Sequence, residues 1–340
     1  MRYIIYGAGG IGGTIGARLF EHGEAVVLIA RGAHADVMAK DGLRLLSPDG
    51  DRRLRIPVVR HPSEVSWTDA DVALLAMKSQ HTAAALEDLR AACAAEPALV
   101  CAQNGVANER MALRHFSRVY GMLVHLPAQH LAPGEVVTHA AGRGGILDTG
   151  RYPGGVDDAC VAIAAALERA GFSARPDPAV MRLKYAKLLT NLGNALQAMV
   201  TPAEDAAAEQ DGHLEPAAIE VLRLLKQEAL ACFRAAGIDC GDRDTLQERQ
   251  AGVYRMAEVP GHPRVGGSSW QSLVRGTGSL ETDYLNGEIV LLGRLHGVPT
   301  PANAACQALI REMLRGRLPA GTFDGAQVLA RVRAAVAAGA

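Results

Sequence analysis

Tyr3-Ile4-Ile5-Tyr6-Gly7-Ala8-Gly9-Gly10-Ile11-Gly12 is the stretch that decides the fold. An apolar, β-branched run leads into G-x-G-x-x-G, and residues 14–21 continue with apolar residues at helical spacing. This order is typical of the first βα unit of a dinucleotide-binding domain, in which the glycines allow a tight turn, a close pyrophosphate and close helix packing. The free backbone N–H groups at the start of a helix can bind a phosphate group. We therefore predict a phosphate-binding loop made by Gly7, Ala8, Gly9, Gly10, Ile11 and Gly12.

The next apolar run indicates which dinucleotide binds. Residues 25–30 read as a short buried strand, and Arg31 follows them where an NAD site usually has Asp or Glu. A guanidinium suits a ribose 2′-phosphate, whereas a carboxylate would repel it. The sequence therefore predicts NADP(H) rather than NAD, with a solvated surface position as the alternative for Arg31.

Composition narrows the class of protein. The 340 residues suit two domains, and 35 Lys and Arg nearly balance 36 Asp and Glu without a block of like charge. We therefore expect no nucleic-acid partner and no membrane partner. Six cysteines without C-x-x-C and eleven histidines without H-x-x-x-H predict reduced thiols and no metal. The sequence starts with a strand pattern rather than a signal peptide, so we expect a soluble, cytoplasmic protein.

The first half of the chain alternates between strand and helix patterns, which predicts a Rossmann-type, doubly wound sheet over residues 1–177. The chain from residue 178 to 325 lacks strand patterns, so we expect an all-helical substrate domain, followed by a helical tail over 326–340. Strands are expected near 72–76, 99–102, 119–123, 135–138 and 145–147, with 172–175 as a candidate last strand. Helices are expected at 10–22, 82–92, 108–116, 157–170, 179–199, 215–236, 242–257, 279–296 and 302–314.

Polar residues follow two of the expected strands. Lys78 comes after the apolar run 72–77, and Asn104 with Gly105 comes after the run 99–102. Ligands of open α/β sheets bind at the carboxyl ends of the strands, so we expect Lys78 and Asn104 to lie together over the cofactor. The alternative for Asn104-Gly105 is an ordinary turn.

The helix after Pro178 carries a polar stripe. Lys184, Lys187, Asn191 and Asn194 share one helix face, and no acidic residue occurs between Asp177 and Glu204. A solvated face normally mixes both signs of charge, so this stripe favours a polar cavity wall over a solvent-exposed face. The chain has only five lysines, which draws attention to the pair at 184 and 187.

Two further motifs follow, Ser268-Ser269 and Glu281-Thr282-Asp283-Tyr284-Leu285-Asn286-Gly287. In order and spacing they and the glycine loop, Lys78, Gln103-Asn104-Gly105 and the helix with Lys187 and Asn191 resemble the ketopantoate reductase (2-dehydropantoate 2-reductase) family from residue 1 to about 315. The resemblance implies NADPH reduction of a 2-oxo acid to a 2-hydroxy acid, a place in pantothenate biosynthesis and a homodimer as one assembly. By position, Lys187 would donate the proton and Glu281 would be its partner. Ser269, Asn104, Asn191 and Asn194 would contact the substrate, and Lys78 and Asn104 the cofactor.

The physical chemistry agrees with these implied roles. Hydride delivery to a ketone builds negative charge on its oxygen, which a protonated lysine can stabilise and protonate. A neighbouring carboxylate keeps a buried lysine charged.

Three stretches differ from the usual family pattern, and all lie on the substrate side. Asn194 lies seven residues after Lys187 instead of eight, Gly266-Gly267 replaces a larger polar residue, and Trp270-Gln271-Ser272-Leu273 replaces Met-x-x-Asp. A more apolar 2-oxo acid is therefore an alternative substrate.

The sequence leaves two alternative functions open: an opine-type or β-hydroxyacid dehydrogenase, and a non-catalytic NADP(H)-binding redox sensor. The sensor would not need Lys187 and Glu281. A methyltransferase would require an acidic residue near position 31, where this chain has Arg31.

Overall fold

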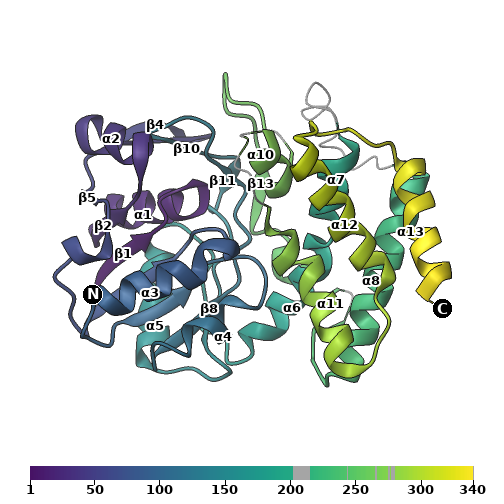
Figure 1. Ribbon diagram of the computed structural model, residues 1–340. Helices are drawn as coiled ribbons and strands as arrows, with labels where there is room; N and C mark the ends of the chain where they lie inside the picture. The colour runs from purple at the N-terminus through teal and green to yellow at the C-terminus, as the bar shows by residue number, and fades with distance from the viewer. Residues whose placement is uncertain (202–214, 243, 265, 275, 277–279, 340) are drawn as a thin grey trace. The chain divides into compact units, whose positions relative to one another are not determined.

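The computed structural model describes residues 1–201, 215–242, 244–264, 266–274, 276 and 280–339 (Figure 1). The chain forms two compact units. The first contains Met1–Lys184 and Asp242–Pro263, and the second contains Tyr185–Gly241 and Arg264–Ala340. The predicted fold class is confirmed, because a parallel α/β sheet unit is followed by a helical region.

A seven-stranded sheet forms the centre of the first unit, in the order β12-β8-β7-β6-β1-β2-β5. Every neighbouring pair is parallel except β12 with β8, which is antiparallel. Continuous apolar runs favour such strands because helices cover both faces of a parallel sheet. The strands are β1 (Arg2–Tyr6), β2 (Ala25–Ile29), β5 (Val58–Val59), β6 (Asp71–Leu75), β7 (Ala98–Cys101), β8 (Val119–Met122) and β12 (Thr149–Arg151).

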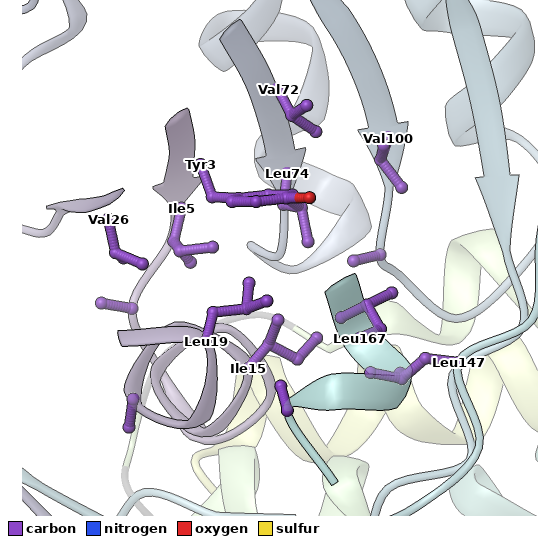
Figure 2. Close-up of a cluster of buried hydrophobic side chains, with 14 of the residues drawn as sticks. Tyr3, Ile5, Ile15, Leu19, Val26, Val72, Leu74, Val100, Leu147 and Leu167 are labelled. Carbon is purple, nitrogen blue, oxygen red and sulfur yellow. The ribbon is translucent and has the colours of Figure 1, made fainter. Parts of the chain in front are cut away.

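Successive side chains of β1 enter two different cores. Tyr3 and Ile5 of β1 pack with Ile15 and Leu19 of α1 (Gly10–Glu21) and with Leu167 of α5 (Asp158–Arg169), as Figure 2 shows. The alternate β1 residues belong to a second core, which α3 (Thr82–Ala92) and α4 (Asn108–Ala112) cover. The period of two along a strand therefore explains why both faces of the sheet are buried.

A smaller sheet packs against α1, with strand order β4-β3-β10-β9. The strand expected at 135–138 forms, but as part of this second sheet. No strand forms at 145–147 or 172–175, where the backbone makes only isolated bridges such as Ile146 with Ser173. Helix α2 (Gly32–Asp41) precedes the second sheet. Its strands are β3 (Leu43–Ser47), β4 (Gly50–Leu54), β9 (Ala128–Gln129) and β10 (Glu135–Thr138).

The prediction of a helix over 242–257 is wrong for the second half of that range. Only α9 (Thr245–Gln250) is helical, and β13 (Tyr254–Met256) instead pairs antiparallel with β11 (Ala140–Gly142). Gly252, at φ 70°, lies between these two elements. The Tyr254 hydroxyl lies 2.7 Å from Nδ1 of His125, so partners distant in sequence hold this strand. Residue 243 lies outside the described residues.

Helices make up the regular structure in the described part of the second unit. Helix α6 (Val180–Asn191) begins in the first unit and continues into the second. The single helix expected over 179–199 is broken at Leu192. The helix expected from 279, a residue outside the described ones, begins at Asn286 after a 3₁₀ turn, η4 (Glu281–Tyr284). The other helices are α7 (Gly193–Val200), α8 (Pro216–Ala235), α10 (Ser268–Val274), α11 (Asn286–His296), α12 (Pro301–Gly316) and α13 (Gly325–Gly339).

Helices α8, α11 and α12 pack on one another, α13 packs on α8 and α12, and α10 packs on α7. Within the described ranges, no helix combines the length and the apolar character that crossing a lipid bilayer requires.

We predict that Gly12→Ala lowers the free energy of unfolding by about 1–3 kcal/mol, because overpacking at a rigid site strains the backbone. A Cβ at position 12 would lie 2.2 Å from the carbonyl oxygen of Gly7. Gly9→Ala is the matched control, since a Cβ there meets nothing within 4 Å. That control is expected to cost less than about 1 kcal/mol as a helix-start substitution. Urea unfolding of both variants checks this, and equal losses would contradict it.

Candidate active site

The carboxyl ends of four neighbouring parallel strands place the predicted cofactor residues along one edge of the sheet. Asn104 follows β7, Lys78 follows β6, Gly7 follows β1 and Arg31 follows β2. These strands are adjacent in the order β7-β6-β1-β2, so the four positions lie in a row. The structure thus brings together the cofactor-side residues that the sequence singles out.

The glycine loop between β1 and α1 leaves room where a phosphate would approach. Gly7 has φ 102°, and a Cβ there would lie 2.7 Å from the backbone nitrogen of Met77. Gly9 precedes the first residue of α1 and faces open space. The first turn of α1 carries no acidic residue, so the positive end of its dipole is not neutralised there. This loop therefore fits a pyrophosphate group.

His34 of α2 holds the glycine loop from one side. The backbone N–H of Gly134 donates to His34 Nδ1 at 2.8 Å, so the ring proton is on Nε2, which donates to Ala8 O at 2.8 Å. Burial lowers the pKa of His34, which favours this neutral form. Sequence reasoning missed His34, because its partners are distant along the chain.

A buried polar network lies beneath the loops that follow β6 and β7. Gln103 Nε2 donates to Met77 O at 2.9 Å and to Thr82 Oγ1 at 2.8 Å. Thr82 Oγ1 donates to Asn108 Oδ1 at 2.8 Å, and Asn108 Nδ2 donates to Asn104 O at 3.1 Å. Hydrogen-bond networks of this kind restrict the conformations of the loops that they join. Sequence reasoning missed Thr82 and Asn108.

The two lysines of the polar stripe occupy different environments. Lys184 is buried and forms an ion pair with the buried Glu109, at 2.8 Å between Nζ and Oε1. Its Nζ also donates to Gln103 O at 2.8 Å and Met122 O at 3.1 Å. Lys187, one turn later on α6, is only partly buried. Lys184 is therefore occupied in anchoring α6 to the strand ends β7 and β8.

Arg31 lies beside two side chains of the first unit. One of its terminal nitrogens is 3.3 Å from the Tyr6 hydroxyl and 3.3 Å from the Asp88 carboxylate of α3. The Arg31 side chain remains 67% exposed. Burial raises the pKa of Tyr6, so this hydroxyl stays protonated at neutral pH. Sequence reasoning found no carboxylate near Arg31, whereas the fold supplies Asp88.

On the substrate side, hydrogen bonds join two segments that the sequence links only by pattern. Asn286, the first residue of α11, donates from Nδ2 to Leu192 O at 3.3 Å and to Asn303 Oδ1 at 3.1 Å. Leu192 follows Asn191, the last residue of α6, and Asn286 follows η4, which begins with the buried Glu281. The helix end that carries Asn191 and the turn that carries Glu281 are therefore tied together.

The packing of α7 on α10 brings Asn194 close to Gly267, which precedes the serine pair at 268 and 269. A Cβ on Gly267 would lie 3.7 Å from Asn194 Oδ1 and 2.5 Å from Gln197 Oε1. The Gly267 N–H donates to that Gln197 oxygen at 2.8 Å. Gln197 thus occupies the space that a side chain at position 267 would need, a role that the sequence does not indicate.

Ser269 is 2% exposed, and its hydroxyl has no hydrogen-bond partner among the described residues. Buried hydroxyls are normally paired, so this one is suited to a ligand. Its neighbour Trp270 is a core residue, whose indole N–H donates to Thr201 O at 3.0 Å. The indole also lies against Gly266, where a Cβ would come within 2.5 Å of the ring. Close packing against the indole therefore explains why position 266 is a glycine.

Among the residues that the structure describes, no group of three or more His, Cys, Asp and Glu side chains could hold a metal ion. Burial raises the pKa of Cys160 to about 11 and that of Cys306 to about 12, so these thiols stay protonated.

Comparison with known proteins places this geometry in a family. The ketopantoate reductase PanE/ApbA family matches residues 3–154, and its C-terminal counterpart matches residues 179–314. The chain belongs to the ketopantoate reductase PanE/ApbA family. Membership of this family makes it an oxidoreductase of the 2-oxo acid reductase type.

Relatives match over nearly their whole length. A 2-dehydropantoate 2-reductase of Halobacterium salinarum is 29% identical over 317 residues, which cover 92% of this chain and 98% of the relative. A crystal structure of a PanE/ApbA family ketopantoate reductase from Ralstonia eutropha is 29% identical, with a TM-score of 0.76 and coverage of 93% and 99%. A D-mandelate dehydrogenase with NADH and anilino(oxo)acetate shares the fold at 22% identity, a TM-score of 0.78 and coverage of 93% and 99%.

We predict that Lys184→Met destabilises this reductase by about 3–5 kcal/mol, because it leaves Glu109 buried and uncompensated. The double variant Lys184→Met/Glu109→Gln removes that charge and should be more stable than the single variant. The same replacement at Lys226, which is only partly buried, should change stability by less than about 0.5 kcal/mol. Urea unfolding measures all three. A double variant no more stable than Lys184→Met would contradict the ion-pair account.

Proposed function

We propose that this protein catalyses NADPH-dependent reduction of a 2-oxo acid to a 2-hydroxy acid, with 2-dehydropantoate as the first substrate to test. The observation that carries the proposal is the row Arg31, glycine loop, Lys78 and Asn104 along one sheet edge. A dinucleotide is long and would extend along such a row, with its pyrophosphate at the start of α1.

Each position in this row suits one part of the cofactor. Arg31 would bind the adenosine end through the 2′-phosphate, because charge-assisted contacts to phosphate are strong. Lys78 would lie near the phosphates, and Asn104 near the nicotinamide and the substrate carbonyl. The bound cofactor supplies the hydride, and the protein supplies its orientation and the proton.

Lys187 is the proposed proton donor. Its ammonium group would stabilise the negative charge that develops on the substrate oxygen and then transfer a proton to it. Glu281 is 4% exposed, and a carboxylate buried to this degree beside the lysine would keep it protonated. Lys184 is unsuited to this role because it is held by Glu109 and two backbone carbonyls.

The proposed substrate contacts are Asn191, Asn194 and the Ser269 hydroxyl, with Asn104 from the sheet edge. The Ser269 hydroxyl, which has no hydrogen-bond partner among the described residues, would bind the substrate carboxylate. Since glycine at 266 and 267 offers no side-chain hydrogen bond, a more apolar 2-oxo acid is the second candidate. A missing contact to a substrate hydroxyl can change discrimination strongly. A homodimer is the proposed assembly.

We predict that Lys187→Ala lowers kcat by about 10²–10⁴-fold, the usual contribution of a general acid. NADPH binding should stay nearly unchanged. Glu281→Gln should fall in the same kinetic class, because it removes the charge that keeps the lysine protonated. Arg182→Ala, which removes a cation from the same helix, is the control and should retain kcat. Steady-state kinetics and NADPH titrations of the three variants measure these effects. Full activity of Lys187→Ala would exclude Lys187 as the proton donor.

The reaction is tested by comparing kcat/KM for 2-dehydropantoate, 2-oxo-3-methylbutanoate and 2-oxo-4-methylpentanoate with NADPH. An advantage for 2-dehydropantoate supports pantoate formation. Comparable or reversed values would keep the reaction class and replace the substrate by an apolar 2-oxo acid. Binding of NADPH without turnover of any 2-oxo acid would favour the redox-sensor alternative.

A further inference from the structure

The pair between Arg31 and Asp88 lies at the adenosine end of the proposed cofactor site. Asp88 comes from α3, and its Oδ2 is 3.3 Å from a terminal nitrogen of Arg31. The two side chains are 67% and 39% exposed, so the pair is weak and can exchange partners. Asp88 is therefore available to a ligand that approaches Arg31.

The position after β2 is the one that distinguishes the two nicotinamide dinucleotides. An acidic residue there accepts a hydrogen bond from the ribose 2′-hydroxyl of NAD, whereas an arginine binds the 2′-phosphate of NADP. This chain presents both groups at one place, the guanidinium from the end of β2 and the carboxylate from α3.

A third group faces the same carboxylate. His61, which lies two residues beyond β5, has its Nε2 3.8 Å from Asp88 Oδ2. Its Nδ1 accepts from the Ser63 N–H at 3.2 Å, so the ring proton of the neutral form is on Nε2 and faces Asp88. Because β5 pairs with β2, the two basic residues come from adjacent strand ends of one sheet.

We propose that Asp88 sets the cofactor specificity of this site, by opposing the 2′-phosphate and accepting a hydrogen bond from the 2′-hydroxyl. The inference rests on the proposed nicotinamide cofactor and does not depend on which 2-oxo acid is reduced. Arg31 favours NADP(H), and Asp88 reduces that preference, so the site accepts both dinucleotides.

The expected size of the effect follows from the charges. Two like unit charges about 4 Å apart in water change an equilibrium by about fivefold, and the phosphate carries more than one charge. Removing the Asp88 charge should therefore raise the ratio of NADP⁺ affinity to NAD⁺ affinity by about five- to tenfold. The increase should shrink in 1 M salt, because both groups are exposed.

The test measures binding of NADP⁺ and NAD⁺ to the full chain by isothermal titration calorimetry, without any substrate. The variant is Asp88→Asn, and Glu87→Gln is the matched control, since Glu87 is exposed and adjacent on the same helix. Asp88→Asn should raise the affinity ratio, Glu87→Gln should leave it unchanged, and Arg31→Ala should lower it. Thermal unfolding of each variant verifies that it is folded.

Three results would overturn the inference. Equal ratios in Asp88→Asn and Glu87→Gln would show only a general charge effect. A lower ratio in Asp88→Asn would mean that Asp88 orients Arg31 for the phosphate. A wild-type chain that binds neither dinucleotide would remove the site altogether. Binding with the expected Asp88 effect but no reduction of any 2-oxo acid would remove the proposed reaction and leave this inference standing.

Discussion

The close approach of α1 to the turn after β1 is the constraint on which the first unit depends. Because Gly12 has no side chain, α1 can begin directly against the carbonyl oxygen of Gly7. This contact sets the direction of α1, whose apolar face then completes the core with β1 and β6 (Figure 2). It also leaves the N–H groups of the first turn beside the open space at Gly9, so packing and anion binding have the same structural origin.

Helix α6 carries two lysines whose charged groups lie in different environments. Lys184 is buried, forms an ion pair with Glu109 and donates to two backbone carbonyls, which anchors the start of the helix within the first unit. Lys187, the proposed proton donor, lies one turn further on and is only partly buried. A buried ion pair contributes little net stability, but it imposes one geometry, and here the geometry concerns the helix that bears the proposed proton donor.

The sequence predicted the parts of the site that depend on strand ends. Gly7, Lys78 and Asn104 each follow an apolar run, and parallel strands necessarily bring such positions to one edge. It could not predict Asp88, because a residue of α3 reaches Arg31 only through the packing of distant elements. The strand Tyr254–Met256 was missed for the same reason, since its partner lies more than a hundred residues earlier. Helical spacing alone also could not separate Lys184 from Lys187, which burial distinguishes.

We propose that the sheet edge from Arg31 to Asn104 binds a nicotinamide dinucleotide in one direction. A crystal structure of the protein with NADP⁺ is the decisive measurement. We expect it to show the pyrophosphate at the start of α1, the 2′-phosphate at Arg31 and the nicotinamide ring at Asn104. A dinucleotide bound in the reverse direction, or bound away from this edge, would contradict it.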